Sequence, residues 1–317
     1  MPVCLALLLV ALTPHDAWAW SPGTHIFLGQ TVLANLPVLP GHIAELLAAH
    51  PLDFLYGSIA ADTSFAKKYV PVGRHSHAWH VGQEIYELAG SAPLRAFGLG
   101  YLAHLAADVV AHNFYVPRQL VVTSSSKALG HSYWEARFDM HVGETHARTA
   151  RELIQRDHGA SDEHLDRILS PTIFSVRTNR RLFRGMVQLT DMTSWIRVVQ
   201  LAADASRWDL ADRLVERNMQ TAYDYVMDLF IAGDAAVARR SDPSGSDALG
   251  AAKRMRRHAL ASGGRRDPDR VVEVAEQLFG LPGTRLGYWD QSGADPVWRT
   301  PGRRSRALAP RGERRRG

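Results

Sequence analysis

The chain has 317 residues, 46% of them hydrophobic and 22% charged, which is the composition of a folded protein with a sizeable core. Its net charge of +5 does not indicate a nucleic-acid-binding protein, because the positive excess lies near the end of the chain. Residues 301–317 hold seven Arg and one Glu, and residues 251–270 hold seven Lys or Arg and two Asp. The residues before 251 are net acidic.

The first 19 residues, "MPVCLALLLVALTPHDAWA", have the features of a secretory signal peptide. An apolar run from Val3 to Leu12 is followed by Ala17-Trp18-Ala19, an A-x-A cleavage pattern. The run is too short to span a bilayer, and we expect no transmembrane helix. Cleavage would export the protein to the periplasm or the medium and would make Trp20 the N-terminal residue. It would also remove Cys4, the only cysteine, so the mature chain could form no disulfide, thiolate zinc site or catalytic cysteine.

Residues 20–238 read as one all-α, multi-helix domain with a metal cluster in a cleft between helices. Apolar residues recur at helical spacing through most of this range, and alternating runs typical of strands are scarce. From residue 239 the composition turns to Ser, Asp and Gly and then to Arg, which predicts a linker, one possible short helix at "DRVVEVAEQLFG" and a disordered Arg-rich tail up to residue 317. We expect a monomer.

The stretch "GYLAHLAADVVAHNFYVP", residues 100–117, reads as a buried helix that carries His104, Asp108 and His112 at four-residue steps. Such a step places side chains on adjacent turns of one helix face. An H-x3-D-x3-H pattern has a chance expectation on the order of a few hundredths in a chain this rich in His. Burying these groups without partners would cost several kcal/mol. A metal ion removes that cost, so the pattern favours metal binding over an exposed polar stripe.

A second pair, His131 and Glu135, follows in "GHSYWEARFD" after a polar loop that would let the chain reverse. Two antiparallel helices could then point both sets of ligands into one cleft. Further candidates are His25 in "WSPGTHIF", Asp62 in "YGSIAADTSF" and His77 in "RHSHAWH".

Together these residues resemble the zinc-dependent phospholipase C family, which includes phospholipase C/D-type domains and shares a superfamily with the trinuclear-zinc nucleases. Members begin their mature chain with Trp. A His, an Asp in a loop, a His before an aromatic residue, an H-x3-D helix with a further His, and an H-x3-E pair then follow. This sequence has each in that order: Trp20, His25, Asp62, His77, His104, Asp108, His112, His131 and Glu135.

The resemblance implies three zinc ions. One would be held by Asp62, His77, His104 and Asp108, a second by His112, His131 and Glu135, and a third by the amino and carbonyl groups of Trp20 with His25 and Asp108. Asp62 would orient or deprotonate the attacking water, or act only as a ligand. His75 or His80 could replace His77.

The resemblance further implies an exported, zinc-dependent phosphodiesterase of phospholipase C type, which hydrolyses a phospholipid-like substrate at a membrane surface with a zinc-activated water. The three residues between Asp108 and His112, where secreted phosphatidylcholine-type enzymes have five, are nearer to the glycosylphosphatidylinositol phospholipase D type and leave the headgroup open. One alternative is a trinuclear-zinc nuclease acting on single-stranded nucleic acid. Glu135, where nucleases have Asp, the lack of cysteine and the acidic catalytic part oppose it, and we expect no stable nucleic-acid partner.

The other alternative is a non-catalytic, zinc-stabilised helical module. Structural zinc sites are closed by four protein ligands, whereas His112, His131 and Glu135 would leave one position open. This open position favours catalysis.

Overall fold

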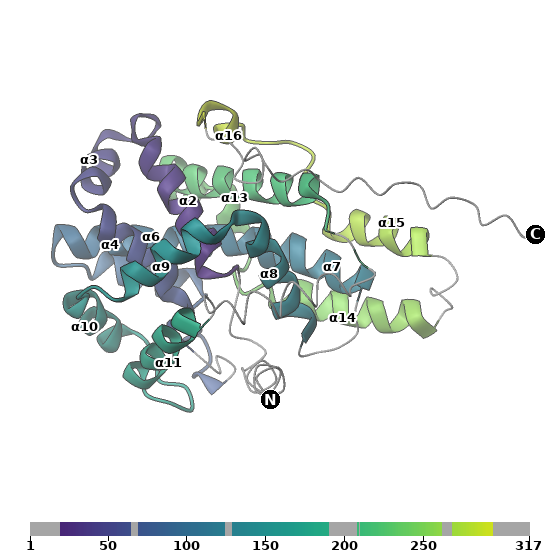
Figure 1. Ribbon diagram of the computed structural model, residues 1–317, viewed down its shortest axis with the longest axis horizontal. Coiled ribbons are helices and arrows are strands. Elements are labelled where there is room, and N and C mark those ends of the chain that lie inside the picture. Colours follow the sequence, from purple (N-terminus) through teal and green to yellow (C-terminus); the bar gives the residue numbers. More distant parts are fainter. Residues whose placement is uncertain are drawn as a thin grey trace, which may run out of the picture.

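The computed structural model describes residues 20–64, 69–123, 129–189, 208, 210–261 and 268–293. Within these residues the protein is helical and has no strand, as predicted (Figure 1). The predicted signal peptide and the Arg-rich tail lie outside them. The α-helices are α2 Pro22–Ala34, α3 Gly41–Ala49, α4 Pro51–Ala60, α5 Trp79–Glu87, α6 Ala92–Val110, α7 Val116–Thr123, α8 Leu129–Val142, α9 Glu144–Ile154, α10 Gly159–Ile168, α11 Val176–Leu189, α13 Asp212–Ala232, α14 Ser246–Ala261, α15 Pro268–Phe279 and α16 Tyr288–Gln291.

The central element is a continuous helix over Ala92–Thr123, made of α6, a π-helical segment at Ala111–Tyr115 and α7. It begins where the Ser91 side chain accepts a hydrogen bond from the N–H of Leu94, which is an ordinary N-cap. Among the described residues it is the one helix that is long and apolar enough to cross a membrane. However, 89% of its most apolar window is buried inside the protein, as in the core helix of a globular fold.

Helices α4 and α6 touch through their backbones, and this contact places part of the site. A Cβ atom on Gly100 would lie 2.0 Å from the carbonyl oxygen of Phe54, and one on Gly57 would lie 2.0 Å from that of Phe97. No side chain larger than hydrogen fits at either position. The close approach brings the end of α4 and the 3-10 helix η2 (Ala61–Thr63) against α6.

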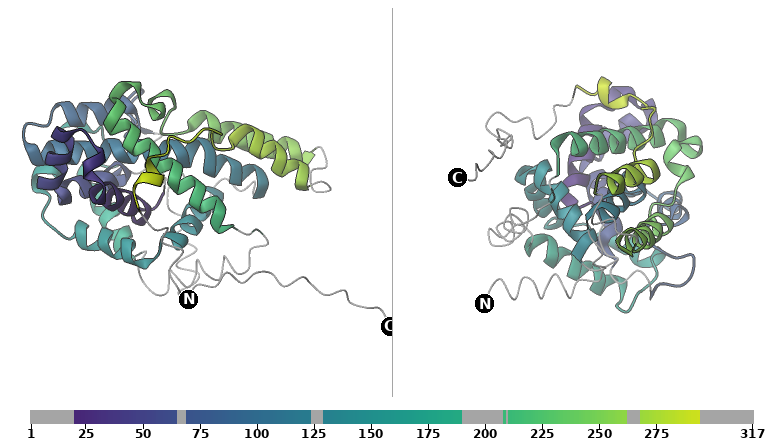
Figure 2. Two further views of the ribbon diagram at one scale, coloured as in Figure 1. Left: turned by 90° about the horizontal axis from the view of Figure 1, so that it is seen from above. Right: turned by 90° about the vertical axis from the view of Figure 1, so that its right-hand side faces the viewer.

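Helices α2, α5 and α13 also pack against α6, and α2 contacts α8 and α9. Figure 2 shows the packed helices in two further views. The start of α2 is held on α8 by two contacts. The Trp20 ring stacks on Phe138 with a centroid distance of 4.9 Å, and the carboxylate of Asp139 accepts hydrogen bonds from Thr24. These contacts bring the N-terminal helix to the same core as α6.

The chain after residue 239 contains more regular structure than the predicted linker with one short helix. The predicted helix is present as α15, and α14 and α16 are additional. Helices α14 and α15 both pack against α7, at the right of Figure 1, and α16 packs against α13. Sequence reasoning missed α14 because its cluster of three Arg and one Lys, together with the flanking Gly and Ser, resembles a disordered segment.

Candidate metal centre

Asp108, on α6, lies at the centre of a cluster of histidines. Its Oδ2 atom is 3.0 Å from Nε2 of His77 and 3.1 Å from Nε2 of His104. Its Oδ1 atom is 3.4 Å from Nε2 of His25, at the start of α2. All four side chains are buried. One carboxylate therefore faces imidazole rings from three separate parts of the chain.

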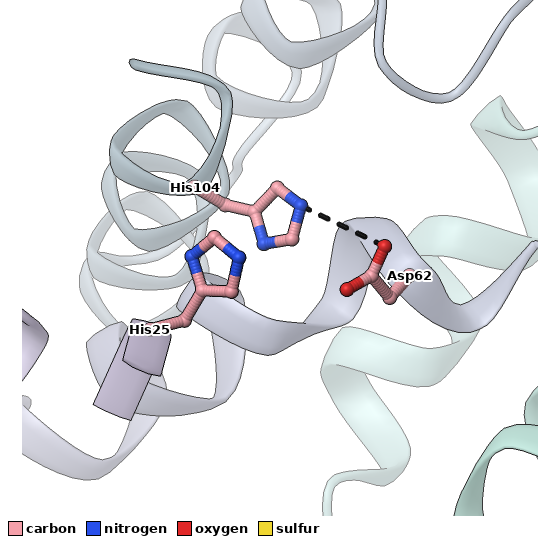
Figure 3. Close-up of side chains that lie close together, drawn as sticks. All are labelled: His25, Asp62 and His104. Atoms are coloured by element: carbon pink, nitrogen blue, oxygen red, sulfur yellow. Dashed lines mark ion pairs between the residues drawn. The ribbon is translucent and has the colours of Figure 1, made fainter. Parts of the chain in front are cut away.

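Asp62 joins this cluster from η2, directly after α4. Its Oδ1 atom lies 3.3 Å from Nε2 of His77 and 3.8 Å from Nε2 of His104. Figure 3 shows Asp62 facing His104 from one side, while the ring of His25 lies on the other. The rings of His25 and His104 are stacked, with a centroid distance of 3.9 Å.

A backbone carbonyl orients the ring of His104. Its Nδ1 atom donates a hydrogen bond to the Ser58 carbonyl oxygen at 2.9 Å. A carbonyl oxygen only accepts, so in the neutral ring the lone pair is on Nε2, the atom that faces both aspartates. A histidine that binds a metal through one ring nitrogen usually donates a hydrogen bond of this kind from the other.

A second group, formed by His112, His131 and Glu135, adjoins the first. His131 and Glu135 are one turn apart on α8, with Nε2 of His131 at 2.5 Å from Oε1 of Glu135. Nε2 of His112 is 3.9 Å from the same oxygen, and its Nδ1 is 4.0 Å from Oδ2 of Asp108. The two helices therefore bring their candidate ligands together, as expected from the sequence.

His112 lies in the π-helical segment, and this local geometry sets its direction. In a regular α-helix a residue eight positions after His104 would be rotated from it by about 80°. The wider turn at Ala111–Tyr115 changes that angle locally. Short π-helical insertions occur frequently at functional sites.

The buried carboxylates and imidazoles around Asp108 shift one another's pKa values. Burial alone would raise the pKa of Asp108, but His104 and the adjacent His25 and His77 hold it well below its usual value. Burial opposes protonation of His104, yet the carboxylates of Asp108 and Asp62 raise its pKa. For His25, burial and then the charge of His104 lower the pKa. The cluster therefore favours the ionised form of Asp108. It also favours the protonated form of His104, but it disfavours a second proton on His25, whose ring is stacked on that of His104.

These residues fit a metal ion on two grounds. Three sets of ligand atoms each lie within 4.8 Å of one another: His25, Asp62 and His104; His77, His104 and Asp108; and His112, His131 and Glu135. Moreover, the contacts of 3.0 to 3.4 Å between buried Asp108 and Nε2 of His25, His77 and His104 do not have hydrogen-bond geometry, so both Asp108 oxygens and Nε2 of His25 are without a hydrogen bond among the described residues. Buried polar atoms rarely lack such partners, and imidazole nitrogen with carboxylate oxygen is a donor set that zinc prefers.

Comparison with known families agrees with this donor set. The family model for zinc-dependent phospholipase C matches residues 24–199, more than half of the chain. The chain belongs to the zinc-dependent phospholipase C family. No curated protein and no solved structure matches it. The matched range contains every predicted metal ligand except Trp20, and the resemblance seen in the ordered motifs is confirmed.

The structure distinguishes the three candidate histidines of this family member, His75, His77 and His80. Of these, His77 lies against the two aspartates of the cluster. Nδ1 of His75 accepts the backbone N–H of His77 at 3.1 Å. His80 is exposed and its Nε2 contacts the carbonyl oxygen of Gly73. The contacts of His75 and His80 are therefore with the backbone of the loop that carries His77, not with Asp108.

Trp20, which in this family would supply its α-amino group, is fully buried, two residues before the start of α2. Its ring stacks on Phe138, one turn after Glu135 on α8. The described contacts do not test coordination by its backbone, and that role stays a prediction.

Sequence reasoning missed two groups that support the metal centre of this family member. Asp139 anchors the turn of α2 that carries His25, and the carbonyl of Pro243 contacts His112 from far along the chain. For Asp139 a signal was available, since it continues the i, i+4 series of His131 and Glu135. For Pro243 the sequence indicated only a turn, "DPSG", with Pro and Gly at favourable positions.

Proposed function

We propose that this member of the family is an exported phosphodiesterase of phospholipase C type, which hydrolyses a phospholipid-like phosphodiester on the glycerol side of the phosphate. The observation that carries the proposal is the position of Asp108 between the two adjoining ligand groups. His25 contacts one of its oxygens, while the other faces His77, His104 and, at 4.0 Å, His112.

The donor groups of this chain would hold zinc at all three places predicted above. Bound zinc would neutralise the phosphate, lower the pKa of a water molecule and stabilise the leaving oxygen of an in-line displacement. His112, His131 and Glu135 provide three donors, which supports an open position for substrate or water.

Asp62 is the residue that we assign to proton transfer. Its carboxylate comes from η2 rather than from the central helix, and its Oδ1 atom lies 3.3 Å from Nε2 of His77. In that position it would orient the attacking water and accept its proton. Asp108, in contrast, is surrounded by imidazoles and would hold the ligand groups together.

The headgroup is not specified by these residues, so a panel of substrates tests the proposal. Zinc content would be measured in protein that begins at Trp20. The protein would then be assayed with a chromogenic choline phosphodiester, phospholipid vesicles and single-stranded DNA. We expect diacylglycerol and a phosphorylated headgroup from the vesicles. Full zinc loading without turnover of any substrate would exclude both enzyme hypotheses, and cleavage of DNA alone would favour the nuclease.

A histidine control makes the assay specific. His104→Ala should abolish zinc binding at the first group and activity with it. His164 is equally buried but donates its hydrogen bond to the Ile85 carbonyl oxygen at 2.7 Å, outside both ligand groups. His164→Ala should retain zinc and the specific activity of its folded fraction. Equal losses in both variants would indicate a general loss of structure.

A further inference from the structure

The segment between α13 and α14, residues 236–245, lies against the second ligand group although the family match ends at residue 199. We call this segment the strap. It consists of Ala236, the 3-10 helix η6, Val237–Arg240, and then Ser241 to Gly245. Its last four residues form a turn in which the N–H of Gly245 donates to the carbonyl oxygen of Asp242 at 3.0 Å.

The strap contacts His112 through backbone atoms. The carbonyl oxygen of Pro243 accepts a hydrogen bond from Nδ1 of His112 at 2.7 Å. The neighbouring Asn113 donates from its side chain to the carbonyl oxygen of Asp242 at 2.8 Å. Gly245 has φ of +58°, and a Cβ atom there would lie 2.4 Å from both Cβ and the carbonyl oxygen of His112. The strap therefore fits the π-helical segment without space for a larger residue.

The contact with Pro243 determines which nitrogen of His112 is available. Because a carbonyl only accepts, Nδ1 carries the hydrogen, and the lone pair of the neutral ring is on Nε2. Nε2 is the atom on the side of Glu135, at 3.9 Å. Without this contact the ring could adopt the other tautomer or rotate, and the donor would no longer face His131 and Glu135.

The strap is itself fixed to the helices on either side. The indole N–H of Trp79, on α5, donates to the carbonyl oxygen of Ser241 at 2.9 Å. The guanidinium of Arg239 lies over the Trp79 ring at 4.6 Å and donates to Gln83 at 2.7 Å. At the other end, Asp228 of α13 accepts the N–H of Val237 at 2.7 Å. These contacts give the Pro243 carbonyl a fixed position.

We propose that the strap is part of the metal centre: through the Pro243 carbonyl and the close fit of Gly245, it positions His112 as a ligand of the second zinc ion. Pro243 and Gly245 are positioning residues that act through His112. The inference rests on the proposed zinc site formed by His112, His131 and Glu135. Outer contacts to a metal-binding histidine typically change metal affinity by about 10- to 100-fold.

The decisive experiment compares two glycine variants of the full chain. Gly245→Ala introduces a Cβ that must displace the strap from His112. Gly293→Ala is the matched control, because Gly293 has a similar φ of +61° but no atom within 4 Å of an added Cβ. Zinc affinity would be measured by chelator competition, and folding by circular dichroism. We expect the weakest-bound zinc of Gly245→Ala to bind at least about tenfold more weakly, with the control unchanged.

Three outcomes would overturn the proposal: wild-type zinc affinity in folded Gly245→Ala, equal losses in both variants, or an Nε2–H tautomer of His112 in zinc-loaded protein labelled with ¹⁵N-histidine. If Gly245→Ala does not fold, Trp79→Phe decides instead. That variant removes the hydrogen bond to Ser241 and keeps an aromatic ring, so unchanged zinc affinity would reject the role of the strap. If wild-type protein binds no zinc through His112, His131 and Glu135, the proposed function fails before the strap is considered.

Discussion

Nε2 of His25 lies 3.4 Å from Oδ1 of Asp108, a contact that joins the first described helix to the central one. The other oxygen of Asp108 faces His77 and His104, at 3.0 and 3.1 Å. A carboxylate with different imidazoles on its two oxygens is suited to bridge two cations. Asp108 is therefore the residue on which most of the proposed centre depends.

Replacement of Asp108 by Ala should remove at least two of the three expected zinc ions and abolish activity, because two of the proposed sites share this carboxylate. Zinc per protein chain, measured after dialysis, tests this. Asp224 is the matched control, since it is equally buried but accepts the N–H groups of Gly287 and Trp289. Asp224→Asn should keep its zinc. An Asp108→Ala protein with three ions would contradict the bridging role.

Replacement of Asp62 by Asn should reduce turnover more than zinc content. The amide keeps an oxygen for a metal but cannot accept a proton at neutral pH, and the loss of a general base typically costs about 10²- to 10⁴-fold in kcat. Steady-state kinetics alongside zinc analysis separate the two effects. Asp53→Asn, on the partly exposed side of α4, serves as the control. A normal kcat in Asp62→Asn would assign Asp62 no part in proton transfer.

Protein that begins at Trp20 should hold one more zinc ion than protein with a single Gly placed before it. A free α-amino group has a pKa near 8 and can lose its proton to a metal at neutral pH, whereas an amide nitrogen does not offer its lone pair. Zinc content and activity of the two forms provide the measurement. Full zinc and full activity in the extended form would show that the Trp20 amine is not a ligand.

Replacement of Gly100 by Ala should destabilise the fold by about 3 kcal/mol or more, because the added Cβ would meet the backbone of α4. Urea unfolding measures the change. Gly185, in α11, has no atom within 4 Å of an added Cβ, so Gly185→Ala should instead stabilise by up to about 1 kcal/mol. Gly100→Ala should also weaken zinc binding, since Ser58 and Asp62 would move away from His104. Equal stability of the two variants would refute the close contact of α4 and α6.

The stability of the protein should show a pH dependence due to Asp139. Burial raises the pKa of Asp139 to about 6, and the hydrogen bonds from the hydroxyl and N–H of Thr24 offset this only in part. Because the folded-state pKa is the higher one, the folded protein binds more protons between about pH 4 and 6, and stability falls as the pH rises through that window.

The titration of Asp139 should change the free energy of unfolding by at most about 3 kcal/mol, because its pKa is raised by about two. Asp139→Asn removes the titration and keeps an acceptor for Thr24. Urea unfolding of both zinc-free proteins at several pH values from about 4 to 6 gives the measurement, with the difference expected to grow in favour of the variant as the pH rises. A difference that does not change with pH would contradict the raised pKa.

The sequence by itself determined the all-helical class, the family and the ordered set of candidate ligands. It could do so because burying His104 and Asp108 in an apolar helix is costly unless they bind a partner. Residues four apart also lie on the same face of a helix, whatever the rest of the fold. The same reasoning identified His131 and Glu135 as a second pair. Each of these inferences depends on residues that are close in the chain.

Only the tertiary structure decided which groups meet. It selects His77 over His75 and His80, because the loop before α5 points one ring of the three at Asp108. It places Asp62 beside His104, because the glycines of α4 and α6 allow their backbones to touch. It also brings the Pro243 carbonyl to His112, across a distance in sequence over which neither composition nor periodicity carries information. Such contacts depend on how helices pack and on the local π-helical turn, and these arise from the sum of many side-chain contacts rather than from any local pattern.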